Sequence, residues 1–147
     1  MKGFPFLYPL LAILSGCLTN GDPEPPVKLE FRTGSLEPRP GFVEMVSPAN
    51  GKPVYISKVS ILGNLDVAGA KVIQGQGGPQ VEIEFTGTGS SKFAEITGNN
   101  IDQLLAILVD GKLISAPVIR DKIEGGKAVL SGQFTQEEAE RISNGLD

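Results

Sequence analysis

The feature that most limits the fold is an apolar run that ends in a tight-turn dipeptide. Asp110 and Gly111 separate two apolar runs, residues 104–109 and 113–119. An Asp-Gly pair readily takes the positive φ values of a two-residue β-hairpin turn. Because residues 106–109 carry only apolar side chains, we expect the first strand in the middle of a sheet, with helices over at least one face.

Further strands and helices follow from local sequence patterns. Four strands are predicted, each bounded by Gly, Pro or Asn, at residues 42–46, 54–62, 71–74 and 80–85. Thr135 and Glu138 have the spacing of a capping box, which predicts the start of a C-terminal helix. A second helix is predicted over residues 90–97, and a short helical turn near Asn64. The combination predicts an α+β fold, a mainly antiparallel sheet with two to three short helices packed on it.

The composition excludes much familiar enzyme chemistry. The 147-residue chain has no His, one Cys and a net charge of −4. Without imidazole it has no Ser-His-Asp site and no His-ligated metal centre, and one Cys gives no internal disulfide. A basic face for nucleic acid is also missing. We therefore expect a protein that is not an enzyme, with no catalytic residues, cofactor or metal and no nucleic-acid partner.

The first 16 residues have the layout of a lipoprotein signal peptide. One positive charge at Lys2 precedes an apolar stretch, residues 4–14, that is too short to span a membrane. The stretch leads into a sequence that resembles the bacterial lipobox: Leu14, Ser15, Gly16 and Cys17. In that motif the signal is cut before the Cys, which then carries the lipid. The alternative, a buried thiol in an N-terminal helix, is disfavoured by Pro5 and Pro9.

The lipobox implies an anchor in the bacterial cell envelope, on the periplasmic or extracytoplasmic side. It does not decide between the inner and the outer membrane. Residues 17–41 are rich in Pro and Gly and are predicted to form a tether, and residues 42–147 the folded domain. Within the tether, apolar and charged residues alternate over residues 27–32, which predicts a strand at a sheet edge.

Several segments together resemble the head subdomain in the large periplasmic domain of SecD and SecDF, subunits of the protein-export machinery. The matching segments are residues 93–97, 105–112, 115–119, 123, 125–126, 131–135 and 138–139, preceded by the "LEFR" strand at 29–32. The resemblance covers nearly all of the chain after Cys17. It implies the α+β fold of that head, here as a stand-alone lipoprotein.

The resemblance also implies a function. The SecD head is thought to hold emerging preprotein, so exported polypeptides or Sec translocon components are the expected partners, besides the membrane at Cys17. The expected polypeptide-binding residues lie in and after the hairpin: Asp110, Gly111, Lys112, Ser115, Ala116 and Pro117. Three alternatives remain open at this point. These residues could matter only to the fold, and the chain could be a structural lipoprotein that docks one defined envelope partner or one that binds a small molecule.

Two other motifs have simpler interpretations than catalysis. Glu82 and Glu84 alternate on one predicted strand and so share a face, like a glycosidase acid pair, but a solvated face is the simpler reading. The Gly-rich residues 75–78 lack the Lys of a phosphate-binding loop, and they are predicted to connect a hairpin.

Overall fold

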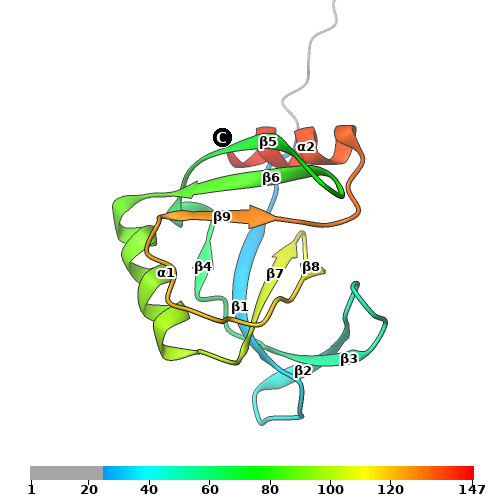
Figure 1. The fold of residues 1–147 in the computed structure, drawn as a ribbon, viewed down its shortest axis with the longest axis vertical. Helices are drawn as coiled ribbons and strands as arrows, with labels where there is room; N and C mark the ends of the chain where they lie inside the picture. Colours follow the sequence, from blue (N-terminus) through cyan, green and yellow to red (C-terminus); the bar gives the residue numbers. More distant parts are fainter. Residues whose placement is uncertain (1–24) are drawn as a thin grey trace, which may run out of the picture.

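The computed structural model describes residues 25–147, which form two antiparallel β-sheets and two α-helices (Figure 1). The elements are β1 Leu29–Ser35, β2 Phe42–Val46, β3 Pro53–Ser57, β4 Leu62–Gly63, the 3-10 helix Asn64–Asp66, β5 Val67–Gly75, β6 Gly78–Phe85, α1 Gly87–Asn99, β7 Leu104–Val109, β8 Lys112–Ser115, β9 Lys127–Leu130 and α2 Gln136–Leu146. The predicted signal peptide, the lipobox and Cys17 lie outside the described residues.

The larger sheet has the order β2-β3-β1-β7-β8, with the short β4 also paired to β1, and the smaller sheet has the order β5-β6-β9. Every strand pair is antiparallel. The smaller sheet and α2 lie at one end of the molecule and the β2–β3 hairpin at the other (Figure 1). The predicted α+β fold with short helices is confirmed.

Strand β7 lies inside the larger sheet, as its apolar sequence predicts, and all six of its residues are buried. Its side chains alternate between two cores. Leu105, Ile107 and Val109 join the main core, which also contains residues of α1, α2 and the smaller sheet. Leu104, Ala106 and Leu108 join a second cluster with β3 and β8. Helices therefore cover one face of the sheet.

Strand β1 is not the edge strand that the sequence predicts. It lies between β3 and β7, and it pairs with β7 from Leu29 opposite Val109 to Gly34 opposite Leu104. The prediction was wrong because charges that alternate with apolar residues do not mark an exposed edge when they pair with one another. Glu30 and Arg32 instead neutralise each other on the second face of the sheet. The main core thus includes residues before 42, namely Val27, Leu29 and Phe31.

Two more predicted strands are shorter than expected. The predicted strand 54–62 is two strands, β3 and β4, joined by a loop, and both pair with β1 at different points. The predicted strand 113–119 ends at Ser115. Pro117, which has no N–H for a ladder hydrogen bond, follows this end. Beyond it the pairing continues at a bridge between Leu104 and Val118, where the Leu105 N–H donates to the Pro117 carbonyl and the Ile119 N–H to the Gln103 carbonyl.

The helix termini follow local capping chemistry. Thr135 accepts a hydrogen bond from the Glu138 N–H at 3.1 Å, and Glu138 accepts one from the Thr135 N–H at 2.8 Å, which confirms the capping box of α2. Helix α1 begins three residues earlier than predicted because Thr86 is its N-cap. The predicted turn near Asn64 is the 3-10 helix.

Candidate functional site

A groove with a volume of about 1100 Å³ runs along β8. All four residues of β8, Lys112–Ser115, line it. The facing wall comes from the end of β9, the segment that follows it and α2, and the turn between β2 and β3 contributes Ser47, Pro48 and Ala49. The groove is thus built where elements far apart in the sequence meet.

The groove follows an open sheet edge. Strand β8 is the last strand of the larger sheet. Within the part of the chain that the structure describes, no backbone group of β8 hydrogen-bonds to any element other than β7. Unpaired N–H and C=O groups at such an edge can accept another strand. The groove therefore offers a bound molecule both backbone hydrogen bonds and apolar contacts.

The structure brings most of the predicted site residues together. Asp110, Lys112, Ser115, Ala116 and Pro117 all line the groove. Gly111 is not among the lining residues and serves the hairpin turn, in which Asp110 and Gly111 have φ values of 51° and 80°. The predicted two-residue hairpin is therefore confirmed, whereas polypeptide binding by these residues stays a prediction.

Sequence reasoning missed the apolar side of the groove. Four residues of this side, from β9, the segment after it and α2, were not in the predicted site: Val129, Gly132, Phe134 and Ile142. Strand β9 is not among the strands predicted from the sequence, and its Val129 is 44% exposed. The signal in the sequence was the run Ala128, Val129 and Leu130 after the Gly pair.

Asp110 stabilises the hairpin turn through contacts with β1 and α2. Its carboxylate accepts a hydrogen bond from the backbone N–H of Lys28 at 2.9 Å and lies 3.3 Å from the guanidinium of Arg141. The backbone N–H of Asp110 in turn donates to the Lys28 carbonyl at 2.8 Å. These contacts join the hairpin turn to the start of β1 and to α2, so the carboxylate is engaged before any partner arrives.

We expect Asp110→Ala to lower the free energy of unfolding by about 1 to 3 kcal/mol, because it removes this acceptor and places Ala at a positive φ. Asp110→Asn is the matched control. It keeps an acceptor oxygen and tolerates the left-handed conformation, so its effect should stay within about 0.5 to 1 kcal/mol, that of losing an exposed ion pair. Urea denaturation measures both variants. Equal destabilisation by both would contradict this structural role.

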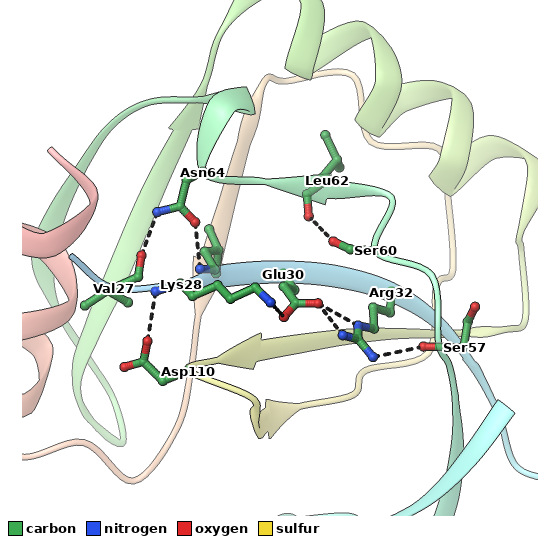
Figure 2. Close-up of polar contacts among 10 residues, drawn as sticks. Val27, Lys28, Glu30, Arg32, Ser57, Ser60, Leu62, Asn64 and Asp110 are labelled. Atoms are coloured by element: carbon green, nitrogen blue, oxygen red, sulfur yellow. Dashed lines mark hydrogen bonds and ion pairs between the residues drawn. The ribbon is translucent and has the colours of Figure 1, made fainter.

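A charged cluster lies at the start of β1 (Figure 2). The side chain of Glu30 is only 6% exposed; its Oε1 lies 3.0 Å from the ammonium of Lys28, and its Oε2 accepts hydrogen bonds from Arg32, including one from Nε at 2.9 Å. Arg32 also donates to the Ser57 carbonyl at 3.3 Å. Burial raises the pKa of Glu30, but the hydrogen bonds from Arg32 and Lys28 outweigh it and hold the pKa below its ordinary value of 4.5. The cluster ties β1 to the last residue of β3.

This cluster predicts an acid-sensitive contribution to stability. Because the pKa of Glu30 is lowered on folding, its contribution is present above pH 4.5 and is lost as the pH falls below that value. We expect Glu30→Gln to lower the free energy of unfolding at pH 7 by about 1.5 to 3 kcal/mol. The variant should also lose less stability than the parent between pH 6 and about pH 3. Urea denaturation across this range provides the measurement.

Glu82→Gln is the control for this pH series. The hydrogen bond from Lys127 lowers the pKa of Glu82 as well, but the side chain of Glu82 is 21% exposed and its two lysine partners are 50% and 66% exposed. Its change should have the same sign and a smaller size, since solvent screens exposed pairs. Identical pH profiles for Glu30→Gln and the parent would contradict the assignment.

The two carboxylates of β6 have different surroundings. Glu82 lies 3.4 Å from the ammonium of Lys71 and 3.3 Å from that of Lys127, so it links β5, β6 and β9. Glu84 is exposed. Within residues 25–147 there is no group of three or more His, Cys, Asp and Glu residues that could hold a metal ion. No helix of this part of the chain is long and apolar enough to cross a membrane.

Comparison with known proteins identifies the fold. Residues 42–147 match the family described as SecDF, P1 head subdomain. The chain is 42% identical over 92 residues to the protein translocase subunit SecD of Magnetococcus marinus, covering 62% of this chain and 18% of that protein. It is 45% identical over 84 residues to the protein translocase subunit SecDF of Thermus thermophilus, covering 56% of this chain and 11% of that protein. The match is thus to a small part of these relatives.

Solved structures agree with this result. One described as a membrane component SecDF that enhances protein export has a TM-score of 0.67 and 30% identity, and the match covers 84% of this chain and 63% of that one. A crystal structure of SecDF in a super-membrane-facing form has a TM-score of 0.66 and 31% identity, with 82% and 18% of the two chains covered.

Proposed function

Because the chain belongs to the family of the SecDF P1 head subdomain, we propose that it is a non-catalytic envelope protein that binds exported polypeptides in the β8 groove. By holding them, it assists their translocation or folding. The observation that carries the proposal is the groove itself, which lies along an open strand edge and is lined by five of the six residues that the family resemblance singles out.

The groove suits a partner of variable sequence. Backbone groups at a strand edge bind the main chain of a partner, which every polypeptide has. Apolar side chains beside them bind the apolar residues that an unfolded chain exposes. Those with exposed surface come from β8, β9 and the segment after β9, and are Ile114, Val129 and Phe134. The buried side chains of Val109, Leu113 and Ile142 lie behind them. Such a site holds many unrelated chains without a catalytic step.

The proposal includes a lipid anchor at Cys17. Each buried methylene contributes about 0.8 kcal/mol to membrane binding, so several acyl chains on one Cys anchor a protein stably. The anchor places the groove at the extracytoplasmic surface of a membrane, where exported chains emerge. Radiolabelled palmitate should label the parent protein and not a Cys17→Ala variant, and labelling of both would contradict this part of the proposal.

Photocrosslinking in living cells tests polypeptide binding. A photoreactive residue at Lys112 or Ser115 should capture many unrelated exported proteins, and capture should stop when secretion is blocked. The same residue at Ser91, which is exposed on α1 outside the groove, is the control. A single stoichiometric envelope partner at Lys112 and Ser115 would overturn the proposal and support the alternative, a structural lipoprotein that docks one defined partner.

A further inference from the structure

The open edge of β8 suggests how a polypeptide binds in this groove, an inference that rests on the proposed function. We propose that one extended segment adds to β8 as a further antiparallel or parallel strand of the larger sheet. The segment has apolar residues at alternate positions and an acidic side chain at the end that lies beside Lys112. The segment pairs with β8 along one of its two edges, and these main-chain hydrogen bonds provide the affinity. Its side chains determine which sequences the groove prefers.

The outer edge of β8 is open, whereas the outer edge of β5 is covered by a helix. The outer edge of β5 is covered by α2, since the Ala70 carbonyl accepts a hydrogen bond from Ser143 at 3.0 Å and the Ala70 N–H donates to Asp147 at 3.4 Å. The described residues provide no such cover for β8. Its four residues contain no Pro, and Pro117 comes only after the strand has ended. The edge is therefore open to a further strand, and its own register to β7 shifts once, between Leu113 and Ser115.

The surroundings of β8 determine which side chains an added strand would carry. Leu113 belongs to the second core cluster, whereas Ile114 packs against the main core. A strand beside β8 therefore directs alternate side chains to these two faces. On the main-core side the groove is lined by Phe134 and Ile142, and the exposed Val129 of β9 also lines it. Apolar residues at every second position of the segment would lie against this wall.

The charges in the groove favour one acidic side chain. Four charged residues line the groove: Asp110, Lys112, Glu138 and Arg141. Asp110 and Arg141 pair with each other, and Glu138 accepts the Thr135 N–H of the capping box. Among the described residues Lys112 has no ion pair. Lys112, at the hairpin end of β8, is thus a cation without a carboxylate at ion-pair distance within residues 25–147, and the other unpaired charge of the groove, the Glu138 carboxylate, lies at the start of α2.

Backbone N-methylation of a peptide distinguishes strand pairing from other binding. The probe is a fluorescein-labelled peptide of about eight residues, alternating Val and Thr with one Glu near one end, titrated against the full chain in detergent by fluorescence anisotropy. In a strand that pairs at one edge, only every second N–H points toward the neighbour. N-methyl groups on one alternate set should weaken binding more than about tenfold, and those on the other set less than about threefold.

The peptide without N-methyl groups distinguishes a failure of strand addition from a failure of polypeptide binding. If it binds, and a photoreactive Ser115 crosslinks to it, but both N-methyl sets weaken binding equally or neither does, strand addition is overturned while polypeptide binding stands. If the parent peptide does not bind at all, the proposed function fails with it.

A charge exchange tests the polarity of the segment. Lys112→Glu should weaken binding of the Glu peptide about two- to fivefold, the range of an exposed ion pair. A peptide with Lys in place of Glu should recover this loss on the Lys112→Glu protein. Because Lys112 is exposed and unpaired, the fold should be unaffected, which thermal unfolding checks. An equal preference of both proteins for the Glu peptide would overturn the role of Lys112.

Discussion

A chain that begins at residue 42 is expected to stay unfolded, although residues 42–147 are the part that matches the P1 head family. The truncation removes β1, which lies between β3 and β7 in the larger sheet, and with it the buried side chains of Val27, Leu29 and Phe31. Phe31 is 0% exposed and packs edge-on against Phe85 and Phe93 at centroid distances of 5.5 and 5.8 Å.

The magnitude follows from the core contacts. Truncating one buried Phe to Ala typically lowers stability by about 3 to 5 kcal/mol, and whole domains are stable by only about 5 to 15 kcal/mol. Losing three buried side chains and the partner of β7 should exceed that margin. Circular dichroism and urea denaturation check the expectation, with a chain that begins at residue 25 as the folded control and Phe31→Ala as the intermediate case. Cooperative unfolding of the 42–147 chain would contradict it.

Filling the groove should remove the capture of exported chains. Ser115→Trp places an indole, with about 150 to 250 Å² of apolar surface, beside the apolar wall of the groove. A client segment must then displace this side chain, so we expect photocrosslinking from Lys112, and binding of the model peptide, to fall by more than about tenfold, which corresponds to about 1.4 kcal/mol.

Ser91→Trp is the matched control for this substitution. It introduces the same side chain at an exposed position of α1 that does not line the groove. It should leave crosslinking and peptide binding within about twofold of the parent, since substitutions at such sites typically change stability by less than about 0.5 kcal/mol. Thermal unfolding shows whether both proteins are folded. Undiminished capture by a folded Ser115→Trp protein would place the binding surface elsewhere.

The groove and β1 are connected through Asp110. Its carboxylate contacts the start of β1 at Lys28 and the guanidinium of Arg141 on α2. The open edge of β8 is therefore held at a fixed place between the larger sheet and α2. A site that accepts chains of many sequences needs such a fixed edge, because the partner brings no fixed shape of its own.

Features that depend on neighbouring residues could be predicted from the sequence. The Asp110-Gly111 turn is set by two backbone conformations, and the capping box of α2 by two hydrogen bonds between residues three apart. The apolar run of β7 predicts burial on both faces, because no polar side chain is left for water. The position of the candidate site was predicted from the family resemblance, which indicates the residues of the hairpin.

Only the tertiary structure decided the place of β1 and the shape of the site. The charges of Glu30 and Arg32 suggest an exposed edge when read along the chain, and their burial is possible because the two side chains neutralise each other across one face of the sheet. The groove requires β8, β9 and α2, which lie up to about 30 residues apart in the sequence and meet only after folding. Local patterns specify turns, caps and apolar strands, whereas pairing between distant strands determines which edge remains open.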